Sequence, residues 1–268
     1  MRSSTTRVLI TGASSGIGRA TAHAYSSPNH ELFLAARRRD RLLEVAEECR
    51  DRGADRVLLR CCDLSVPGQG KELVEACLSE MGGVEILVCN AGYGVYGPIG
   101  EVSPEEMLRI WQVNYQAAYE SIHEVLPHML EKGRGHIVLV SSVIGRKALP
   151  YAGAYCATKF AQVALGESLW GELKNTGVGI SVICPGYTAT EFQRSAVKTA
   201  SLRSMRRLGG GQSPEVVAGA IVKAVRRKTR EVHLTFSGRL LCGMSRLSPG
   251  LVNLIMAWVV GREQSGKK

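Results

Sequence analysis

The stretch RVLITGASSGIG, residues 7–18, joins an apolar run to a glycine-rich turn. Residues 7–11 are apolar and β-branched, which predicts a short buried strand. Residues 17–26 have the periodicity of a helix, so the glycines stand where a strand meets a helix. A turn of this kind points backbone N–H groups at a position where they can receive a phosphate.

The same strand-then-helix pattern recurs along the chain. Continuous apolar runs of this length are typical of parallel strands that are buried on both faces and joined by helical crossovers. The pattern therefore predicts a doubly wound α/β fold in one domain. The six further strands are predicted at residues 32–35, 57–61, 86–89, 137–140, 180–183 and 232–234.

Two helix starts are marked with particular clarity, at residues 103–106 and 213–215. Each has a serine cap, a proline at the first helical position and early acidic residues. We expect the first of these helices to run, with a possible break, to Pro127.

The composition indicates one globular domain in a reducing compartment. The chain has 268 residues, of which 45% are hydrophobic and 22% charged, with no repeat or linker that divides it. Its eight cysteines form no C-x-x-C pair and no zinc spacing with the six histidines, so we expect reduced core thiols and no metal site. The first apolar run is too short for a signal peptide. A cytoplasmic protein is expected.

The formal net charge of +10 raises the question of nucleic-acid binding. The positive residues are scattered in small groups without interleaved aromatic side chains that could stack on bases. A basic surface suits anionic cofactors, acyl carriers or lipid head groups equally well. We expect no nucleic-acid partner.

The glycine turn at residues 12–18 allows three interpretations. Its spacing, G-x-x-x-G-x-G, departs from the common G-x-G-x-x-G dinucleotide fingerprint and lacks the Gly-Lys-Ser/Thr of a P-loop. A tight turn of small packing residues is the structural alternative. The same residues match G-x-S-x-G, which makes Ser14 a candidate hydrolase nucleophile. However, the turn follows the first strand, so no upstream loop supplies a second oxyanion donor.

A second pattern lies in SSVIGRKALPYAGAYCATK, residues 141–159. Tyr155 and Lys159 are four positions apart, which places them on one helix face. An ammonium beside a phenol favours its ionised form, so we expect Lys159 to lower the pKa of Tyr155 toward the range useful in acid–base catalysis. Ser142 lies upstream, where it could hydrogen-bond a carbonyl oxygen. The spacing alone also fits a core tyrosine and a solvated lysine.

Taken together, these motifs resemble the short-chain dehydrogenase/reductase family, over about residues 7–232. The resemblance implies a Rossmann-like domain that binds NAD(P) and a cofactor that carries the hydride. The residues that carry it are Gly12, Ala13, Ser14, Ser15, Gly16, Ile17, Gly18, Asn90, Ala91, Gly92, Asn114, Ser142, Tyr155, Cys156, Ala157, Thr158, Lys159, Pro185 and Gly186.

The resemblance also implies catalytic roles. Ser142 would polarise the substrate carbonyl and Tyr155 would exchange the proton. Lys159 would hold the nicotinamide ribose and lower the Tyr155 pKa, and Asn114 would help to hold a water that relays protons. The implied cofactor contacts are Gly12, Ser14, Ser15, Gly16, Ile17, Gly18, Asp63, Asn90, Ala91, Gly92, Tyr155, Lys159, Pro185, Gly186, Thr188 and Thr190.

The end of the second strand predicts which cofactor is preferred. An NAD site would have a carboxylate there, which accepts hydrogen bonds from the ribose 2′-hydroxyl and repels a 2′-phosphate. Ala36 stands in that place, followed by Arg37 and Arg38. Arg37, with Arg38 as helper, can pair with a 2′-phosphate, so NADP(H) is expected over NAD(H). A solvated helix entry is the alternative for these arginines.

The loops near Tyr155 predict an apolar, aromatic substrate pocket and therefore a hydrophobic carbonyl or alcohol as substrate. The polar segment 191–212, which ends in three glycines, is expected to be a mobile lid. The pocket residues are Tyr93, Tyr96, Ile144, Leu149, Tyr151 and Tyr187.

Residues 237–268 are interpreted as an apolar and basic tail after the main domain, residues 1–236. The tail contains LVNLIMAWVV, residues 251–260, which is shorter than the roughly 20 apolar residues that span a bilayer. A helix on the substrate loop, a dimer contact and attachment to a membrane surface remain open for it.

The predicted function is NADP(H)-dependent interconversion of a carbonyl and an alcohol. Because members of the family pair through their long helices, a homodimer or homotetramer is expected. A serine hydrolase that uses Ser14 and a non-catalytic NADP-binding scaffold are the alternatives.

Overall fold

A parallel sheet of seven strands, in the order β3-β2-β1-β4-β6-β7-β9, forms the centre of the protein. The computed structural model describes residues 5–202, 211–248, 250 and 252–254. All seven predicted strands are present, which confirms the doubly wound α/β fold. They are β1 (Thr6–Thr11), β2 (His30–Ala36), β3 (Arg56–Cys61), β4 (Ile86–Cys89), β6 (Gly135–Val140), β7 (Val178–Cys184) and β9 (Glu231–His233).

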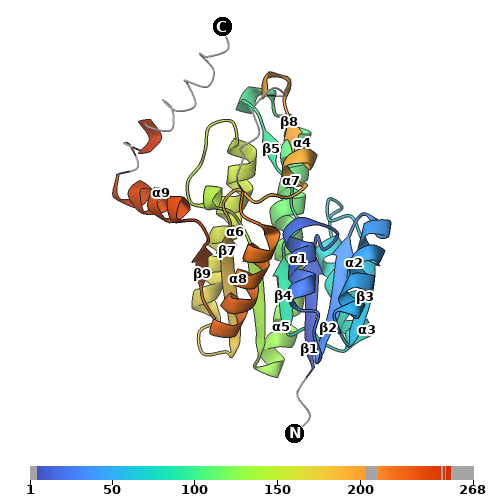
Figure 1. The fold of residues 1–268 in the computed structure, drawn as a ribbon. Coiled ribbons are helices and arrows are strands. Elements are labelled where there is room, and N and C mark those ends of the chain that lie inside the picture. Colours follow the sequence, from blue (N-terminus) through green and yellow to red (C-terminus); the bar gives the residue numbers. More distant parts are fainter. Residues whose placement is uncertain (1–4, 203–210, 249, 251, 255–268) are drawn as a thin grey trace.

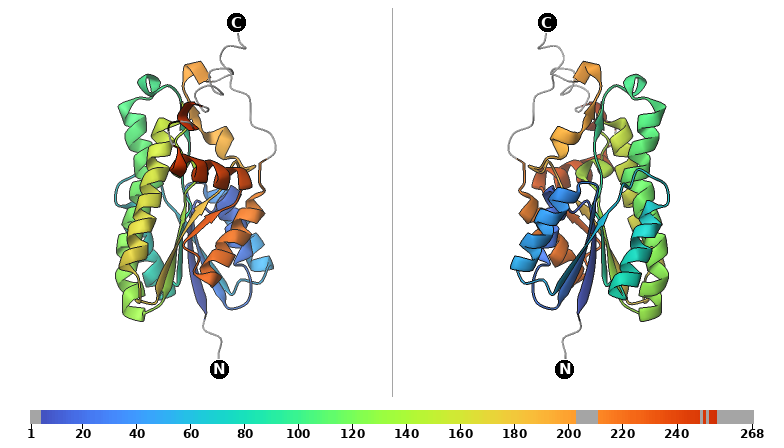
Figure 2. Two further views of the ribbon diagram at one scale, coloured as in Figure 1. Left: turned by 90° about the vertical axis from the view of Figure 1, so that its left-hand side faces the viewer. Right: turned by 90° about the vertical axis from the view of Figure 1, so that its right-hand side faces the viewer.

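Helices cover both faces of the sheet (Figures 1 and 2). One layer contains α1 (Gly16–Ala24), α2 (Arg39–Asp51) and α8 (Pro214–Arg227), and the other contains α3 (Gln69–Met81), α5 (Ala117–Lys132) and α6 (Gly153–Glu172). Successive side chains of a strand enter opposite layers, as Leu9 and Ile10 of β1 do. Both faces are buried, which explains why the strands appear in the sequence as unbroken apolar runs.

Both predicted helix starts are confirmed. The Ser103 hydroxyl accepts a hydrogen bond from the Glu106 N–H at 3.2 Å, and Ser213 accepts one from the Val216 N–H at 3.4 Å. After Ser103, α4 (Pro104–Trp111) passes through a π-helical turn, η2 (Gln112–Gln116), into α5. The prediction that this helix ends at Pro127 is wrong, since α5 continues to Lys132. Pro127 lies on the exposed side, where water can bind the carbonyl that loses its partner.

The predicted lid contains short elements rather than a plain loop. They are α7 (Phe192–Ser195), β8 (Val197–Lys198) and η4 (Ala200–Leu202). β8 forms a two-stranded parallel sheet with β5 (Val95–Tyr96), which the sequence did not suggest. η1 (Ile99–Glu101) follows β5. Residues 203–210 of the predicted lid lie outside the described residues.

The structure describes the side chains of seven of the eight cysteines. All seven thiols are free and six are buried as expected, while Cys61 at the end of β3 is exposed. α9 (Phe236–Leu247) follows β9. Of the predicted tail run 251–260, only residues 252–254 are described. Within the described part of the chain, no helix has the length and apolar character needed to cross a membrane.

Candidate active site

One cavity of about 910 Å³ opens where the carboxyl ends of the central strands meet their loops. Of the predicted site residues, only Asn114 and Gly18 are missing from its walls. The others that line it are Gly12, Ser14, Ser15, Gly16, Ile17, Arg37, Arg38, Asp63, Asn90, Ala91, Gly92, Tyr93, Tyr96, Ser142, Ile144, Leu149, Tyr151, Tyr155, Lys159, Pro185, Gly186, Tyr187, Thr188 and Thr190.

The turn between β1 and α1 has a shape that only glycine permits at two positions. Gly12 has φ +67°, and a Cβ there would lie 2.9 Å from the Ala91 Cα. A Cβ on Gly18 would lie 2.2 Å from the Gly12 oxygen. Gly18 therefore packs closely behind the turn, and its expected contact with the cofactor stays a prediction.

Asn90 holds this turn against the end of β4. Its side-chain amide donates to the Thr11 carbonyl at 2.9 Å, and its main-chain N–H donates to the Thr11 hydroxyl at 3.0 Å. The first N–H groups of α1 thus face the cavity from a fixed position, with no Cβ on Gly12 or Gly16 in the way. The pyrophosphate of a dinucleotide fits such a helix N-terminus.

Basic side chains line the end of the cavity next to β2. Arg37 is there as predicted, and it is joined by Arg109 of α4, which the sequence analysis missed. Burial acts to raise the pKa of Asp63, but hydrogen bonds from Ser65 and the charges of Arg37 and Arg109 outweigh it and lower this pKa. Arg37 and Arg109 are therefore both close enough to Asp63 to make this end of the cavity electropositive.

Arg38 forms an ion pair with Glu191. Its Nη1 donates to Glu191 Oε2 at 3.0 Å, and Arg41 lies 3.9 Å from the other oxygen of the same carboxylate. Glu191 immediately precedes α7, so this ion pair spans the mouth of the cavity. Sequence reasoning missed the contact because the partners are 153 positions apart.

Ser142, Tyr155 and Lys159 meet at the middle of the cavity. Ser142 follows β6 and begins the short helix η3 (Val143–Gly145), and its hydroxyl hydrogen-bonds with Tyr155. The neighbouring Ser141 is buried and donates to the Lys159 main-chain oxygen at 3.0 Å. Of the two serines, Ser142 is the one whose hydroxyl lies with the phenol.

The electrostatics of Tyr155 differ from the expectation. Burial raises its pKa well above 10, and the Ser142 hydrogen bond offsets only part of this effect. The expected lowering by Lys159 is not found, because its Nζ lies 5.8 Å from the ring centroid and burial lowers the Lys159 pKa to about 7. The resting form of Tyr155 is the neutral phenol, which is a proton donor.

Asn114 lies behind the cavity, within the π-helical turn. Its Oδ1 accepts from the Tyr93 N–H at 3.0 Å, and its Nδ2 donates to the Tyr93 carbonyl at 2.9 Å and to the Thr158 hydroxyl at 3.1 Å. The side chain thus holds the Tyr93 loop to α6. The expected part of Asn114 in proton relay stays a prediction.

Aromatic rings surround the Tyr155 phenol. The centroid of Tyr96 lies 5.9 Å away and that of Phe192 5.5 Å away. Phe192 comes from the lid and was not predicted. Tyr151 has φ +62°, which is costly for a residue with a Cβ, and its carbonyl accepts from the Gly97 N–H at 2.8 Å. These contacts place an apolar wall around the reacting group.

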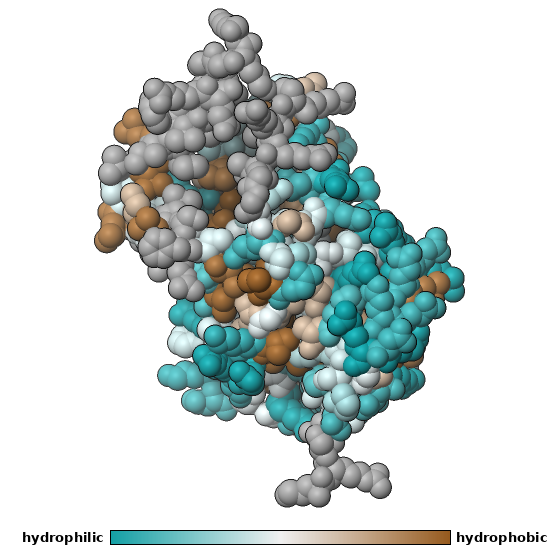
Figure 3. All heavy atoms as spheres, viewed as in Figure 1, coloured by the Kyte–Doolittle hydropathy of each residue, from teal (hydrophilic) through white to brown (hydrophobic). Residues whose placement is uncertain are grey.

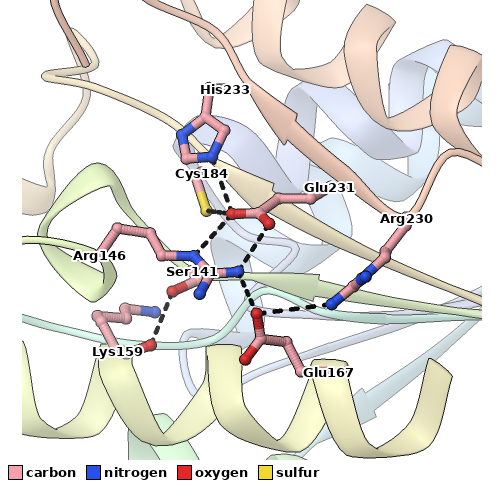
Figure 4. A network of polar contacts seen from close by, with 8 residues as sticks. All are labelled: Ser141, Arg146, Lys159, Glu167, Cys184, Arg230, Glu231 and His233. Carbon is pink, nitrogen blue, oxygen red and sulfur yellow. Dashed lines mark hydrogen bonds and ion pairs between the residues drawn. The ribbon is translucent and has the colours of Figure 1, made fainter. Parts of the chain in front are cut away.

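An ion-pair network lies directly behind this site (Figure 4). Arg146, at the end of η3, binds Glu231 of β9 through Nε at 2.8 Å and Nη2 at 2.7 Å, and it reaches Glu167 of α6 at 2.8 Å. Burial alone would raise the pKa of Glu231, but hydrogen bonds from His233 and Arg146 lower it to about 2. The network ties the loop that carries Ser142 to β9 and α6.

Comparison with known proteins agrees with this arrangement. The family model described as short chain dehydrogenase matches residues 6–201. The ketoacyl reductase HetN of Nostoc sp. is 30% identical over 257 residues, which cover 94% of this chain and 88% of that protein. A dehydrogenase/reductase SDR family protein 7-like of Anopheles gambiae is 33% identical, and the match covers 93% of this chain and 81% of that protein.

Solved structures give the same result. A short-chain dehydrogenase/reductase from Burkholderia phymatum in complex with NAD has a TM-score of 0.82 at 27% identity, with 92% of this chain and 95% of that chain covered. An alcohol dehydrogenase from Thermococcus sibiricus complexed with 5-hydroxy-NADP has a TM-score of 0.75 at 28% identity. The match covers 85% of this chain and 95% of that chain. The chain belongs to the short-chain dehydrogenase/reductase family and is an NAD(P)-dependent oxidoreductase.

Proposed function

We propose that this enzyme interconverts a ketone or aldehyde and the corresponding alcohol on a hydrophobic small molecule, with NADP(H) as its cofactor. One observation carries the proposal: the phosphate-binding turn, Arg37 and the Ser142–Tyr155–Lys159 cluster line a single cavity. A bound nicotinamide supplies or accepts the hydride. The remaining steps belong to side chains of the protein.

In the direction of reduction, Ser142 and Tyr155 both donate hydrogen bonds to the carbonyl oxygen. Tyr155 then transfers its proton as charge develops on that oxygen. The Lys159 ammonium stabilises the resulting phenolate. The raised pKa of Tyr155 keeps the phenol protonated before the reaction, which suits a proton donor.

The function is tested by NADPH oxidation with a panel of hydrophobic aldehydes and ketones. We expect turnover with some members of the panel and none with small polar ketones, because the rings of Tyr96 and Phe192 form the wall next to Tyr155. Absence of NADPH binding would contradict the proposal, whereas NADPH binding without turnover of any carbonyl would favour the non-catalytic NADP-binding scaffold. Hydrolysis at Ser14 is disfavoured because, within the described residues, no histidine hydrogen-bonds to it.

The NADP(H) preference depends on Arg37. We expect Arg37→Asp to lower the kcat/KM ratio of NADPH to NADH by about 10²-fold, because one charge-assisted pair is lost and one repulsion is gained. Arg39→Asp, at the exposed start of α2 and outside the cavity, is the matched control and should leave the ratio unchanged. Equal efficiency with both cofactors in the unmodified enzyme would contradict the preference.

Association through the long helices α5 and α6 gives a homodimer or homotetramer in this proposal. Apolar side chains exposed on these helices support it: Tyr119 is 43% exposed, Phe160 41% and Trp170 46%. Sedimentation equilibrium at the monomer mass would contradict it. The six buried free thiols support a cytoplasmic location.

Peripheral membrane contact through the C-terminal segment is the last part of the proposal. Leu240 and Leu247 of α9 are 52% and 89% exposed, and Figure 3 shows apolar atoms gathered over this helix. A surface of this kind favours an interfacial position. We expect Leu240→Ser/Leu247→Ser to reduce flotation with anionic liposomes several-fold, whereas Val66→Ser/Leu130→Ser should not. Equal flotation of both double variants would dismiss the contact.

A further inference from the structure

Gln162 lies on α6, three residues after Lys159, and is only 1% exposed. Both polar ends of its side chain are used. Its Oε1 accepts a hydrogen bond from Lys159 Nζ at 2.9 Å, and its Nε2 donates to the Asn114 main-chain oxygen at 2.6 Å. One buried amide therefore connects the ammonium at the active site to the π-helical turn.

The π-helical turn makes the second of these bonds possible. In a regular α-helix each inner carbonyl accepts from the N–H four residues later. The wider turn of η2 disturbs that pattern around Asn114. The Gln162 amide supplies a donor to the Asn114 carbonyl, and the Asn114 side chain is engaged elsewhere with Tyr93 and Thr158.

The first bond decides how the ammonium is oriented. A lysine ammonium has three N–H donors. One goes to the Val140 carbonyl at 2.9 Å and one to Gln162 at 2.9 Å. The third is left for the cavity side, where Tyr155 lies.

If Gln162 had only a structural role, a simpler side chain could take its place. Burial of an amide costs free energy unless every polar atom is paired, and an aliphatic side chain at this position would avoid that cost. Satisfying the Asn114 carbonyl requires only a donor. The hydrogen bond from Lys159 to the Gln162 oxygen is not needed for that purpose, so it indicates a second role for the side chain.

We propose that Gln162 is a positioning residue for the reaction: it fixes the Lys159 ammonium in its charged form, with one N–H directed at the cavity. The inference rests on the proposed function for its catalytic meaning, although the bond itself can be tested without turnover. No other residue of α6 contacts the Lys159 nitrogen among the hydrogen bonds of the described chain.

The groups around Lys159 set the direction of the expected change. Burial lowers its pKa to about 7, and the Cys184 thiol of β7 acts to raise it. Tyr155 of α6 lies near the Lys159 ammonium, and its phenol is neutral around pH 7, where Lys159 titrates. Val140 of β6 and Asn114 of η2 present only uncharged groups. Gln162 supports the charged form, so its loss should lower the Lys159 pKa further.

The test is an NMR titration of cofactor-free protein labelled with lysine at the ε-carbon. The Lys159 resonance is assigned from its absence in Lys159→Met. We expect Gln162→Met, which keeps the side-chain length, to lower the Lys159 pKa by about one unit or more. Gln162→Glu should raise it, because a carboxylate favours the neighbouring ammonium. Gln112→Met is the matched control and should leave it unchanged, since Gln112 is a half-buried glutamine of the same π-helical turn whose Nε2 has no hydrogen-bond partner among the described residues.

Enzyme assays give the second readout. The pH above which carbonyl reduction declines should move down in Gln162→Met by the same amount, whereas a merely structural defect would lower kcat without moving the profile. An unchanged Lys159 pKa in both folded Gln162 variants overturns the inference. Failure to find a carbonyl substrate would instead count against the proposed function and would leave the titration decisive for Gln162.

Discussion

Tyr155→Phe should lower kcat for NADPH-dependent carbonyl reduction by about 10²–10⁴-fold, the usual contribution of a positioned general acid. The ring remains, so the contacts with Tyr96 and Phe192 are kept and the packing around the pocket should not change. Only the phenolic proton and the hydrogen bond with Ser142 are lost. The dissociation constant for NADPH, measured by fluorescence titration, should therefore stay within about twofold of the original value.

A suitable control is Tyr25→Phe. Tyr25 is also buried, but it belongs to the core on the α1 side of the sheet, and its hydroxyl has no hydrogen-bond partner among the described residues. This variant should keep full activity, because it removes a buried hydroxyl far from the cavity. If Tyr155→Phe retained turnover within about tenfold of the original enzyme, another group would have to donate the proton.

Arg146→Met should destabilise the protein by about 3 kcal/mol, the lower end of the cost of removing one partner from a buried ion pair. The side chains of Arg146 and Glu231 are only 15% and 18% exposed, so water cannot replace the lost contacts fully. Urea unfolding near neutral pH measures the loss. Arg134→Met is the control, since Arg134 is 58% exposed and should cost less than about 1 kcal/mol.

The destabilisation should depend on pH. The pKa of Glu231 is lowered to about 2 in the folded protein, against about 4.3 in an unfolded chain. The contribution of its pairing is therefore complete above about pH 5 and is lost as the pH falls toward 2. The difference in unfolding free energy between the original protein and Arg146→Met should shrink over that range.

A double variant separates the ion pair from the space it fills. Arg146→Met/Glu231→Leu removes both charges, so it should be more stable than either single variant. Activity should remain about tenfold reduced in both Arg146 variants, because the loop that carries Ser142 loses its link to β9 and α6. If the double variant were as unstable as the sum of the single variants, the two charges would not be coupled.

The sheet and most of the cavity could be predicted because their signals are local. Each central strand is a continuous apolar run. The loop at the carboxyl end of most of these strands carries a short motif that can be recognised from adjacent residues. The loops that carry these motifs meet in the folded sheet, and one cavity is lined by Gly12, Asn90, Ser142 and Tyr155. The seven strands are parallel, so their carboxyl ends lie at one edge of the sheet.

The residues that sequence reasoning missed depend on contacts between distant segments. Glu191 meets Arg38 across the cavity mouth, Arg146 meets Glu231 behind it, and Gln162 meets Asn114 inside it. None of these residues stands in a motif or a periodic pattern that marks its partner. The pKa of Tyr155 was predicted in the wrong direction for a related reason, since burial is a property of the whole fold.

The π-helical turn at Gln112–Gln116 also fixes the relative rotation of the helices on either side of it. One additional residue in a helix rotates everything after it by about 100°. α4 can thus direct Arg109 into the cavity while α5 directs Val125 and Met129 into the core. Deletion of a single residue there would restore a regular helix, but it would turn the apolar stripe of α5 away from the sheet. A change in the length of this short segment would therefore disturb the packing of the whole of α5.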